Sequence, residues 1–180
     1  ILFVGRIAPN KAFQDIIAAA ALLRTKIPNV KVRFVGDTSF TSYYSYLTKL
    51  VSQLALEDVV TFTGRVTETQ LATEYLSAQV FCCLSDHEGF GVPILEAMKL
   101  GLPVIAYNAA AVPETLGNAG LLINNKSPII VATAIERVIT DQNLSKSMTA
   151  AGEQRAAKFS ENYTASKFFS AINSMGDYEN

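Results

Sequence analysis

Short apolar runs alternate with segments of helical periodicity along most of this chain. Val80–Leu84 is the clearest run, because it is apolar throughout. A strand without a polar face is typical of the middle of a parallel sheet, where helices cover both sides. Parallel strands need long crossover connections, which are usually helices. The alternation therefore predicts an α/β fold built on a parallel sheet.

The chain has 180 residues, and we interpret it as one domain, 1–180, with a Rossmann-like sheet of about six strands and helices on both faces. Thr67 and Gln70 have the spacing of a capping box, and Gly101 is placed to end a helix. A polar, Ala-rich loop is expected after Tyr107. The expected strands are Ile1–Gly5, Val30–Val35, Val59–Thr63, Val80–Leu84, Pro103–Tyr107 and Gly120–Ile123, and the expected helices are Ala12–Ile27, Tyr43–Leu56, 67–78, Gly91–Leu100 and two or three more from Pro128 to about Ser174.

Composition excludes several classes of function. About half of the residues are apolar and the formal net charge is −1. Binding to a nucleic-acid backbone needs clustered Lys and Arg, so a nucleic-acid partner is not expected. No run reaches the roughly 18 apolar residues that a membrane-spanning helix requires.

Cys82 and Cys83 are adjacent in an expected strand, so their side chains point to opposite faces and are poorly placed to pair. We expect two buried, free thiols, which favours a reducing, cytoplasmic setting. The chain opens on a core strand without an initiating Met or a signal-peptide pattern. We therefore expect a piece of a larger protein.

The stretch from Ser85 to Met98 is the most informative segment, and it reads SDHEGFGVPILEAM. It joins an expected strand to an expected helix, and Gly89 and Gly91 allow positive φ and close backbone approach. The free N–H groups at the start of such a helix favour a phosphate. In open parallel sheets, ligands bind beyond the carboxyl ends of the strands, where this segment lies.

Glu88 and Glu96 flank this turn, with seven residues between them. Carboxylates repel phosphate but accept hydrogen bonds from neighbouring hydroxyl groups. A ligand with hydroxyls on both sides of a diphosphate would satisfy both glutamates. A sugar nucleotide has this form.

Arg6 directly follows the first strand, and Lys11 lies in the next loop or at the start of the next helix. Both are expected at the ligand edge of the sheet. Negative charge gathers on the β-phosphate when a sugar nucleotide loses its sugar, and fixed cations there stabilise the transition state. They would replace a metal, and no Asp-x-Asp pair is present to hold one.

The string from Glu88 to Met98, followed by Gly101-Leu-Pro-Val-Ile and Val112-Pro-Glu-Thr-Leu-Gly117, resembles glycosyltransferase family 4. The resemblance covers nearly the whole chain, and it includes Leu2-Phe-Val-Gly-Arg6, Val35-Gly-Asp37 and Phe62-Thr-Gly-Arg-Val66. It implies one half of a two-domain GT-B fold, the C-terminal donor-binding half, in a retaining hexosyltransferase.

The resemblance also implies a role for each matching residue. Arg6 and Lys11 would neutralise the donor diphosphate, Glu88 would contact the sugar hydroxyls and Glu96 the ribose hydroxyls. The remaining contacts would be made largely by main chain. They are assigned to Gly89, Phe90 and Gly91, which would hold the sugar and phosphates, and to Gly64, Arg65 and Val66, which would meet the base.

Two positions depart from the family pattern. The family often has Gly after the basic-loop Lys, where this chain has Ala12, and a Gly-rich loop where this chain has Ala109-Ala110-Ala111. His87 and Glu114 lie near the same edge. His87 could act as a general acid or base beside Glu88, but we interpret it first as a surface or loop histidine and Glu114 first as a carboxylate at a helix start. The family's catalytic His belongs to its other domain, so that role is not assigned to His87.

Other functions remain open at this stage. A nicotinamide-binding domain fits poorly, because Ile94 stands where the third Gly belongs and Asn108 follows the next strand in place of an acidic residue. A GT-B epimerase or phosphorylase and a non-catalytic nucleotide-sugar-binding module are the alternatives. We expect no cofactor, a donor of UDP, GDP or ADP type, and a glycan or lipid acceptor bound by an N-terminal domain absent from this chain. Membrane contact at the inner face is compatible with this, but not through this domain.

Overall fold

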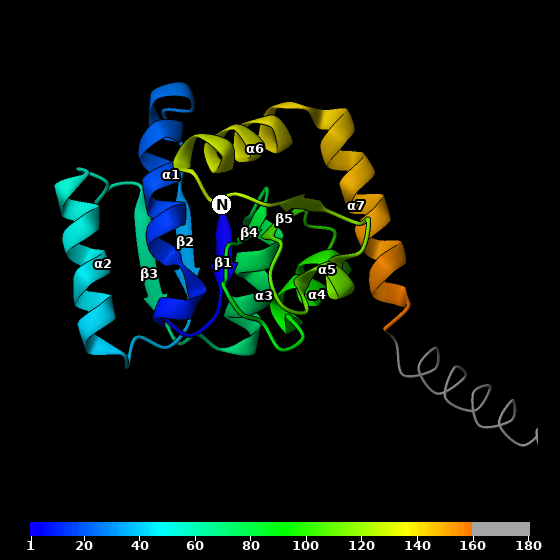
Figure 1. The fold of residues 1–180 in the computed structure, drawn as a ribbon, viewed down its shortest axis with the longest axis horizontal. Helices are drawn as coiled ribbons and strands as arrows, with labels where there is room; N and C mark the ends of the chain where they lie inside the picture. Colours follow the sequence, from blue (N-terminus) through cyan, green and yellow to red (C-terminus); the bar gives the residue numbers. More distant parts are fainter. Residues whose placement is uncertain (160–180) are drawn as a thin grey trace, which may run out of the picture.

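The computed structural model describes residues 1–159, and its centre is a six-stranded sheet in which every neighbouring pair is parallel (Figure 1). The strand order is β3-β2-β1-β4-β5-β6. The predicted α/β, Rossmann-like sheet of six strands is therefore confirmed. The strands are β1 (Leu2–Val4), β2 (Val32–Val35), β3 (Val60–Gly64), β4 (Phe81–Cys83), β5 (Val104–Tyr107) and β6 (Leu121–Ile123).

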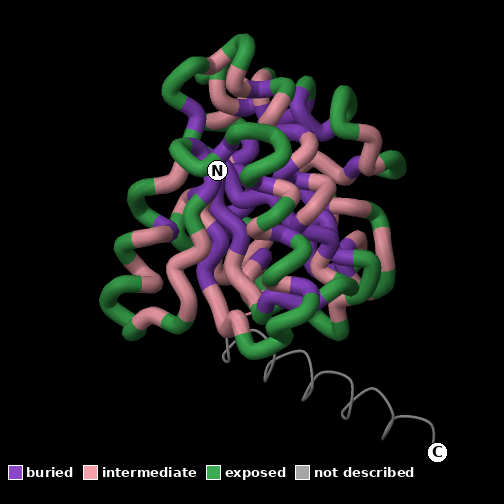
Figure 2. Tube along the Cα trace, turned by 90° about the vertical axis from the view of Figure 1, so that its left-hand side faces the viewer, coloured by how far each residue is buried: buried purple, intermediate pink, exposed green. Residues whose placement is uncertain are grey.

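The connections between the strands are helices, which cover the sheet so that its strands form the buried centre (Figures 1 and 2). After β6, the chain returns to pack α6 against α1. The helices are η1 (Pro9–Lys11), α1 (Phe13–Lys26), α2 (Thr41–Gln53), α3 (Glu68–Ser77), α4 (Val92–Lys99), α5 (Val112–Leu116), α6 (Pro128–Thr140) and α7 (Gln142–Ala157). The part of the predicted tail helices beyond residue 159 lies outside the described residues.

Most predicted boundaries agree with the structure to within a few residues. The capping box is confirmed: Thr67 accepts from the backbone of Gln70, whose side chain accepts from the backbone of Thr67. Gly101 is not itself the cap of α4. Leu100 is the C-cap, and Gly101 follows it with a φ of 73°.

The expected Ala-rich loop after Tyr107 was wrong in part, because it contains α5. This helix has only five residues, and so short a segment shows no helical period. Pro113 near its start and Gly117 as its C-cap are the signals that it carries. The short 3-10 helix η1 was also not predicted as an element, since three residues give no period.

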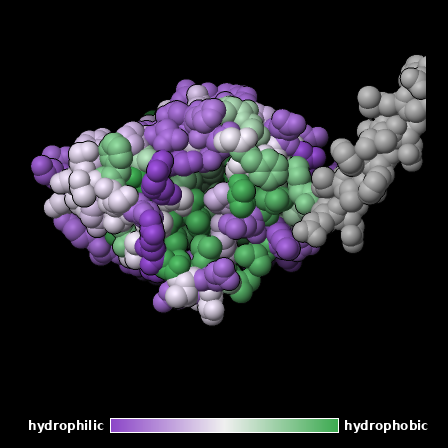
Figure 3. Space-filling model, turned by 90° about the horizontal axis from the view of Figure 1, so that it is seen from below, coloured by the Kyte–Doolittle hydropathy of each residue, from purple (hydrophilic) through white to green (hydrophobic). Residues whose placement is uncertain are grey.

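The strand order reverses between β1 and β4. From β1 the chain adds β2 and β3 on one side of the sheet, and it then crosses to add β4, β5 and β6 on the other side. Loops that leave such neighbouring strands in opposite directions open a crevice at the carboxyl edge of the sheet. This edge lies at the bottom of Figure 1 and faces the viewer in Figure 3, where an apolar hollow is bordered by hydrophilic residues.

Candidate functional site: the carboxyl edge of the sheet at β1 and β4

Lys11 is brought to the crevice by a loop with an unusual backbone. It ends η1, and the next residue, Ala12, has φ 53° and ψ 42°, the left-handed conformation that favours glycine. The Gly that the related family often has at this position is therefore replaced without losing the conformation. Phe13 then anchors the start of α1 in the core, with its ring 4.9 Å from that of Phe3.

Glu88 and Lys11 form an ion pair across the crevice. The Nζ atom of Lys11 lies 2.6 Å from Oε1 of Glu88, and both side chains are largely buried. The same Oε1 accepts a hydrogen bond of 2.7 Å from the hydroxyl of Ser85, which is itself fully buried. Two predicted site residues, one after β1 and one after β4, thus meet directly.

Cys83 completes the surroundings of Glu88. Its sulfur lies 3.9 Å from Oε1 of Glu88 and 3.5 Å from the hydroxyl oxygen of Ser85. Burial raises the pKa of the Cys83 thiol to about 11, so the thiol stays neutral beside the carboxylate. Both cysteines are free and buried, as predicted.

The turn between β4 and α4 presents backbone donors to the crevice. Gly91 has φ 81° and is the N-cap of α4, and no side chain caps this helix. The backbone N–H groups of Gly89, Phe90, Gly91 and Val92 make no hydrogen bond within residues 1–159. Four successive free donors at a helix start have the chemistry of an anion site.

Helix α5 holds this turn from behind. The backbone N–H of Ala111 donates to the carbonyl of Glu88 at 3.3 Å. The hydroxyl of Thr115, which is buried, donates to the carbonyl of Phe90. Ala110, just before this contact, has φ 49°, a second left-handed alanine where the related family has a Gly-rich loop.

Glu96 lies in the second turn of α4 and is bonded to helix α3. Its Oε2 accepts a 2.7 Å hydrogen bond from the phenol of Tyr75, whose side chain is buried and stacks on Phe81. Burial, together with the hydrogen bond to Glu96, raises the pKa of Tyr75, so the phenol remains a donor. Glu88 and Glu96 therefore lie at opposite ends of the turn of free N–H groups.

The segment Gly64–Val66 begins at the last residue of β3, which is two strands away from β1 in the sheet. The guanidinium of Arg65 donates to the carboxylate of Asp37, which follows β2. This contact, with help from the backbone of Ser39, lowers the pKa of Asp37 to about 2. Arg65 thus faces a carboxylate of this chain, and its segment forms the outer part of the same edge.

Arg6 is exposed, and its side chain makes no hydrogen bond or ion pair within the described residues. It is therefore available to an anion at this edge. His87 and Glu114 are exposed as well, and no side-chain partner holds them in the described part of the chain.

Four residues at this edge were not singled out from the sequence: Ser85, Tyr75, Thr115 and Lys126. Lys126 follows β6 and bonds the carboxylate of Asp86, with Asp15 at 3.3 Å. It ties the turn before Glu88 to the start of α1. Ser85 directly follows the apolar run Val80–Leu84, but nothing in the sequence says which groups these four residues bond.

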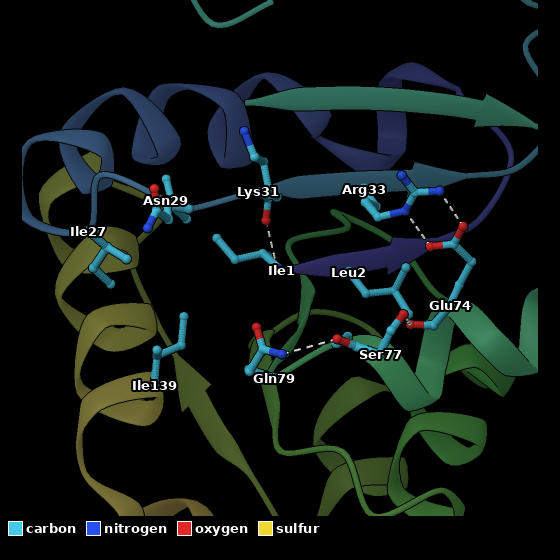
Figure 4. Close-up of a pocket in the computed structure, with 12 residues that line it drawn as sticks. Ile1, Leu2, Ile27, Asn29, Lys31, Arg33, Glu74, Ser77, Gln79 and Ile139 are labelled. Atoms are coloured by element: carbon cyan, nitrogen blue, oxygen red, sulfur yellow. Dashed lines mark hydrogen bonds and ion pairs between the residues drawn. The ribbon is translucent and has the colours of Figure 1, made fainter. Parts of the chain in front are cut away.

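A separate cavity of about 260 Å³ lies at the opposite, amino edge of the sheet (Figure 4). It is bordered by Ile1, Lys31 and Gln79, and Arg33 forms a two-pronged pair with Glu74 there. None of the predicted site residues lines it, so the candidate site remains the carboxyl edge.

No described helix is long and apolar enough to cross a membrane. No group of three or more His, Cys, Asp or Glu side chains in this part of the chain is placed to hold a metal ion.

A doubly wound parallel sheet with free backbone N–H groups at its switch point defines a Rossmann-like class of α/β protein. Within that class the family can be stated. Residues 1–155 match the family glycosyl transferases group 1, and the chain belongs to this family of glycosyltransferases.

Relatives with known roles include two mannosyltransferases. The chain is 31% identical to the GDP-mannose-dependent alpha-(1-6)-phosphatidylinositol monomannoside mannosyltransferase of Mycobacterium tuberculosis, over 86% of this chain and 42% of that protein. It is also 31% identical to O-antigen chain mannosyltransferase B of Escherichia coli, over 91% of this chain and 43% of that protein. The chain thus spans less than half the length of these relatives.

Solved structures show the same fold. The HepE protein of Anabaena, in complex with UDP-glucose, has a TM-score of 0.82 at 25% identity and covers 97% of this chain, which covers 48% of HepE. The C-terminal domain of a group 1 glycosyl transferase, LpcC of Francisella tularensis, has a TM-score of 0.77 at 27% identity, over 88% of this chain and 84% of that domain. The fold is that of one half of a GT-B glycosyltransferase.

Proposed function

We propose that this chain is the donor-binding domain of a retaining glycosyltransferase, which moves a hexose from a nucleoside-diphosphate sugar to a glycan or lipid acceptor. The observation that carries the proposal is the crevice itself. From Glu88 to Glu96 it offers a carboxylate, four free backbone N–H groups and a second carboxylate, in that order along the chain, and the ammonium of Lys11 lies beside the first carboxylate. This order matches sugar, diphosphate and ribose.

The diphosphate would lie over the turn of free N–H groups at the start of α4. The ammonium of Lys11, which bonds Glu88 in the structure, has three N–H donors and would turn toward the phosphate oxygens when the donor binds. Arg6, exposed at the end of β1, supplies a second fixed cation. Both would stabilise the charge that gathers on the β-phosphate as the bond to the sugar breaks.

The sugar would lie at Glu88 and the ribose at Glu96. Both carboxylates are deep enough in the crevice to be held by buried hydroxyl groups, so both are rigid acceptors. The base would then lie toward Gly64–Val66, where main-chain groups follow β3. These roles for Arg6, Lys11, Glu88–Gly91, Glu96 and Gly64–Val66 remain predictions.

Several similarities support the finer parts of the proposal. The likeness to the Francisella C-terminal domain supports a C-terminal position in a longer protein. The mannosyltransferase relatives support a hexose donor, and the phosphatidylinositol substrate in one of their names supports a lipid-linked acceptor. Lys11 and both glutamates are retained together with a formed crevice, which favours an enzyme over a non-catalytic binding module.

Calorimetry with this chain tests donor binding directly. We expect binding of UDP-glucose or GDP-mannose, and of the matching nucleoside diphosphate, in buffer with EDTA. A roughly 1 mM binder at high concentration also raises the melting temperature measurably. Binding that appears only after Mg²⁺ or Mn²⁺ is added would contradict the roles of Arg6 and Lys11.

The stereochemical part of the proposal needs the complete enzyme with its acceptor. The anomeric coupling of the product, measured by NMR, should match that of the donor. Inversion would overturn the retaining assignment while leaving donor binding by this chain untouched.

A further inference from the structure

Each of the two glutamates is held by one buried hydroxyl group from elsewhere in the chain. Ser85 donates to Oε1 of Glu88 at 2.7 Å, and Tyr75 donates to Oε2 of Glu96 at 2.7 Å. Both donors are nearly or fully excluded from solvent. From this we infer that Ser85 and Tyr75 are positioning residues, which fix the two carboxylates so that each presents its second oxygen to the sugar nucleotide. The inference rests on the proposed function.

The hydrogen bonds of Glu88 use one of its two carboxylate oxygens and leave the other for a ligand. Oε1 receives the ammonium of Lys11 and the hydroxyl of Ser85, and the thiol of Cys83 lies near it. Oε2 has no hydrogen-bond partner within residues 1–159. A carboxylate bound through one oxygen by two donors cannot turn freely, so Oε2 is the oxygen left to accept a hydroxyl.

Lys11 cannot do this alone. Its ammonium is the group that the diphosphate would draw away from Glu88, because both are anions competing for one cation. The hydroxyl of Ser85 is neutral and buried, so the charge of the diphosphate would not draw it away from Glu88. Ser85 therefore keeps Glu88 oriented when Lys11 turns to the donor.

The surroundings of Glu96 repeat the arrangement from the other side. Tyr75 donates to Oε2, and its ring is fixed by stacking on Phe81 with ring centres 6.0 Å apart. The raised pKa of Tyr75 keeps the phenol protonated, which its donor role requires. Oε1 of Glu96 has no partner in the described part of the chain and is left for the ribose.

A purely structural role makes a different prediction. Buried polar side chains need a partner whatever their function, so the two hydrogen bonds could serve stability alone. In that case, removing a hydroxyl would lower stability and would affect all ligands alike. Positioning instead predicts that each hydroxyl affects only the ligand part that its own glutamate meets.

The test compares Ser85→Ala and Tyr75→Phe in this chain with two ligand pairs, UDP with UDP-glucose and GDP with GDP-mannose, using the pair that the wild type binds. We expect Ser85→Ala to raise the Kd of the sugar nucleotide about three- to tenfold, the usual effect of one lost hydrogen bond, and to leave the Kd of the nucleoside diphosphate within about twofold. Tyr75→Phe should raise both values by the same factor, and in a Glu96→Ala background it should raise neither value further, whereas a purely structural role would still raise both.

Matched controls separate these effects from general damage. Ser77→Ala and Tyr46→Phe remove the same groups at exposed positions and should change neither Kd. In a Glu88→Ala background, Ser85→Ala should have no further effect on the preference for the sugar nucleotide. If Ser85→Ala fails to fold, Ser85→Cys keeps a weak donor of similar size and should show a partial loss of that preference.

The outcomes distinguish the inference from the proposed function. If the wild type binds neither ligand of either pair, the proposed function fails and the inference falls with it. If Glu88→Ala weakens only the sugar nucleotide while Ser85→Ala changes nothing, the function stands and the inference is wrong. An equal loss for both ligands with Ser85→Ala would assign Ser85 a structural role only.

Discussion

Three alanines in the described chain adopt the left-handed backbone region, where glycine is preferred. Ala12, Ala55 and Ala110 have φ values of 53°, 52° and 49°. This conformation costs a residue with a Cβ atom about 1–2 kcal/mol, and glycine avoids that cost. Glycine loses about 0.5–1 kcal/mol through its greater freedom in the unfolded chain. The difference favours glycine by about 0–1.5 kcal/mol, with a midpoint of about 0.75 kcal/mol, where the methyl group makes no other contribution.

Burial decides which of the three sites keeps that gain. Ala55 and Ala110 are exposed, so their methyl groups contribute little to packing. Ala12 is fully buried, and losing its methyl group removes about 0.8 kcal/mol of hydrophobic stabilisation. We therefore expect Ala55→Gly and Ala110→Gly to raise the free energy of unfolding, and Ala12→Gly to leave it nearly unchanged.

Urea denaturation at constant m-value measures these differences, and a gain of 1 kcal/mol also raises the melting temperature by about 2–4 °C in a protein of this size. Ala18→Gly, in the interior of α1, is the matched control and should lower stability by about 1 kcal/mol. If Ala55→Gly and Ala110→Gly lower stability as Ala18→Gly does, the reasoning from backbone conformation is refuted.

Three further predictions follow from single contacts. Gly36→Ala would place a Cβ atom 2.1 Å from the carbonyl oxygen of Gly5, at a φ of 147°, so it should destabilise by about 3 kcal/mol or more in urea titrations. The pKa of Asp37, lowered to about 2 by Arg65, means that this group stabilises the fold above about pH 4 and that the stabilisation is lost as the pH falls toward 2. The Asp37 carboxyl resonance should titrate near pH 2, and Arg65→Gln should return it toward 3.8. Lys11→Met should raise the Kd of UDP and of GDP about tenfold in calorimetry, because a charged donor to the diphosphate is removed.

The fold was predictable because the spacing of apolar residues distinguishes most strands from most helices in this sequence. Most strands are apolar runs that end at a turn residue, as Val80–Leu84 does. Every crossover except the one from β5 to β6 is long enough to show helical spacing, as in the helix after Gly91. The sixth strand, expected at Gly120–Ile123, is also present. The two elements that were not predicted, η1 and α5, are too short to show a helical period in the sequence. The left-handed backbone conformations of Ala12 and Ala110 were not predictable either, because alanine rarely adopts them.

The part of the site that was predictable from local sequence is the continuous segment from Glu88 to Glu96. Glu88, Gly91 and Glu96 share one continuous segment, so their proximity follows from the sequence. Ser85 and Tyr75 support that segment through hydrogen bonds from buried hydroxyl groups, and these bonds form only once the chain has folded. The bond from Tyr75 to Glu96 depends on the angle at which α3 packs against α4, and no local pattern fixes that angle.

The pair between Lys11 and Glu88 joins residues 77 positions apart, and topology alone accounts for their meeting. β1 and β4 are neighbours at the point where the strand order reverses, so the loops after them are the two walls of one crevice. Each charge neutralises the other, and neither is left unpaired in a largely buried place. Under the proposed function, a nucleoside diphosphate would compete with Glu88 for Lys11, whereas a sugar nucleotide would also bring hydroxyl groups that can bond the carboxylate. The same pair would then favour the intact donor over the nucleoside diphosphate, because only the donor would satisfy both members of the pair.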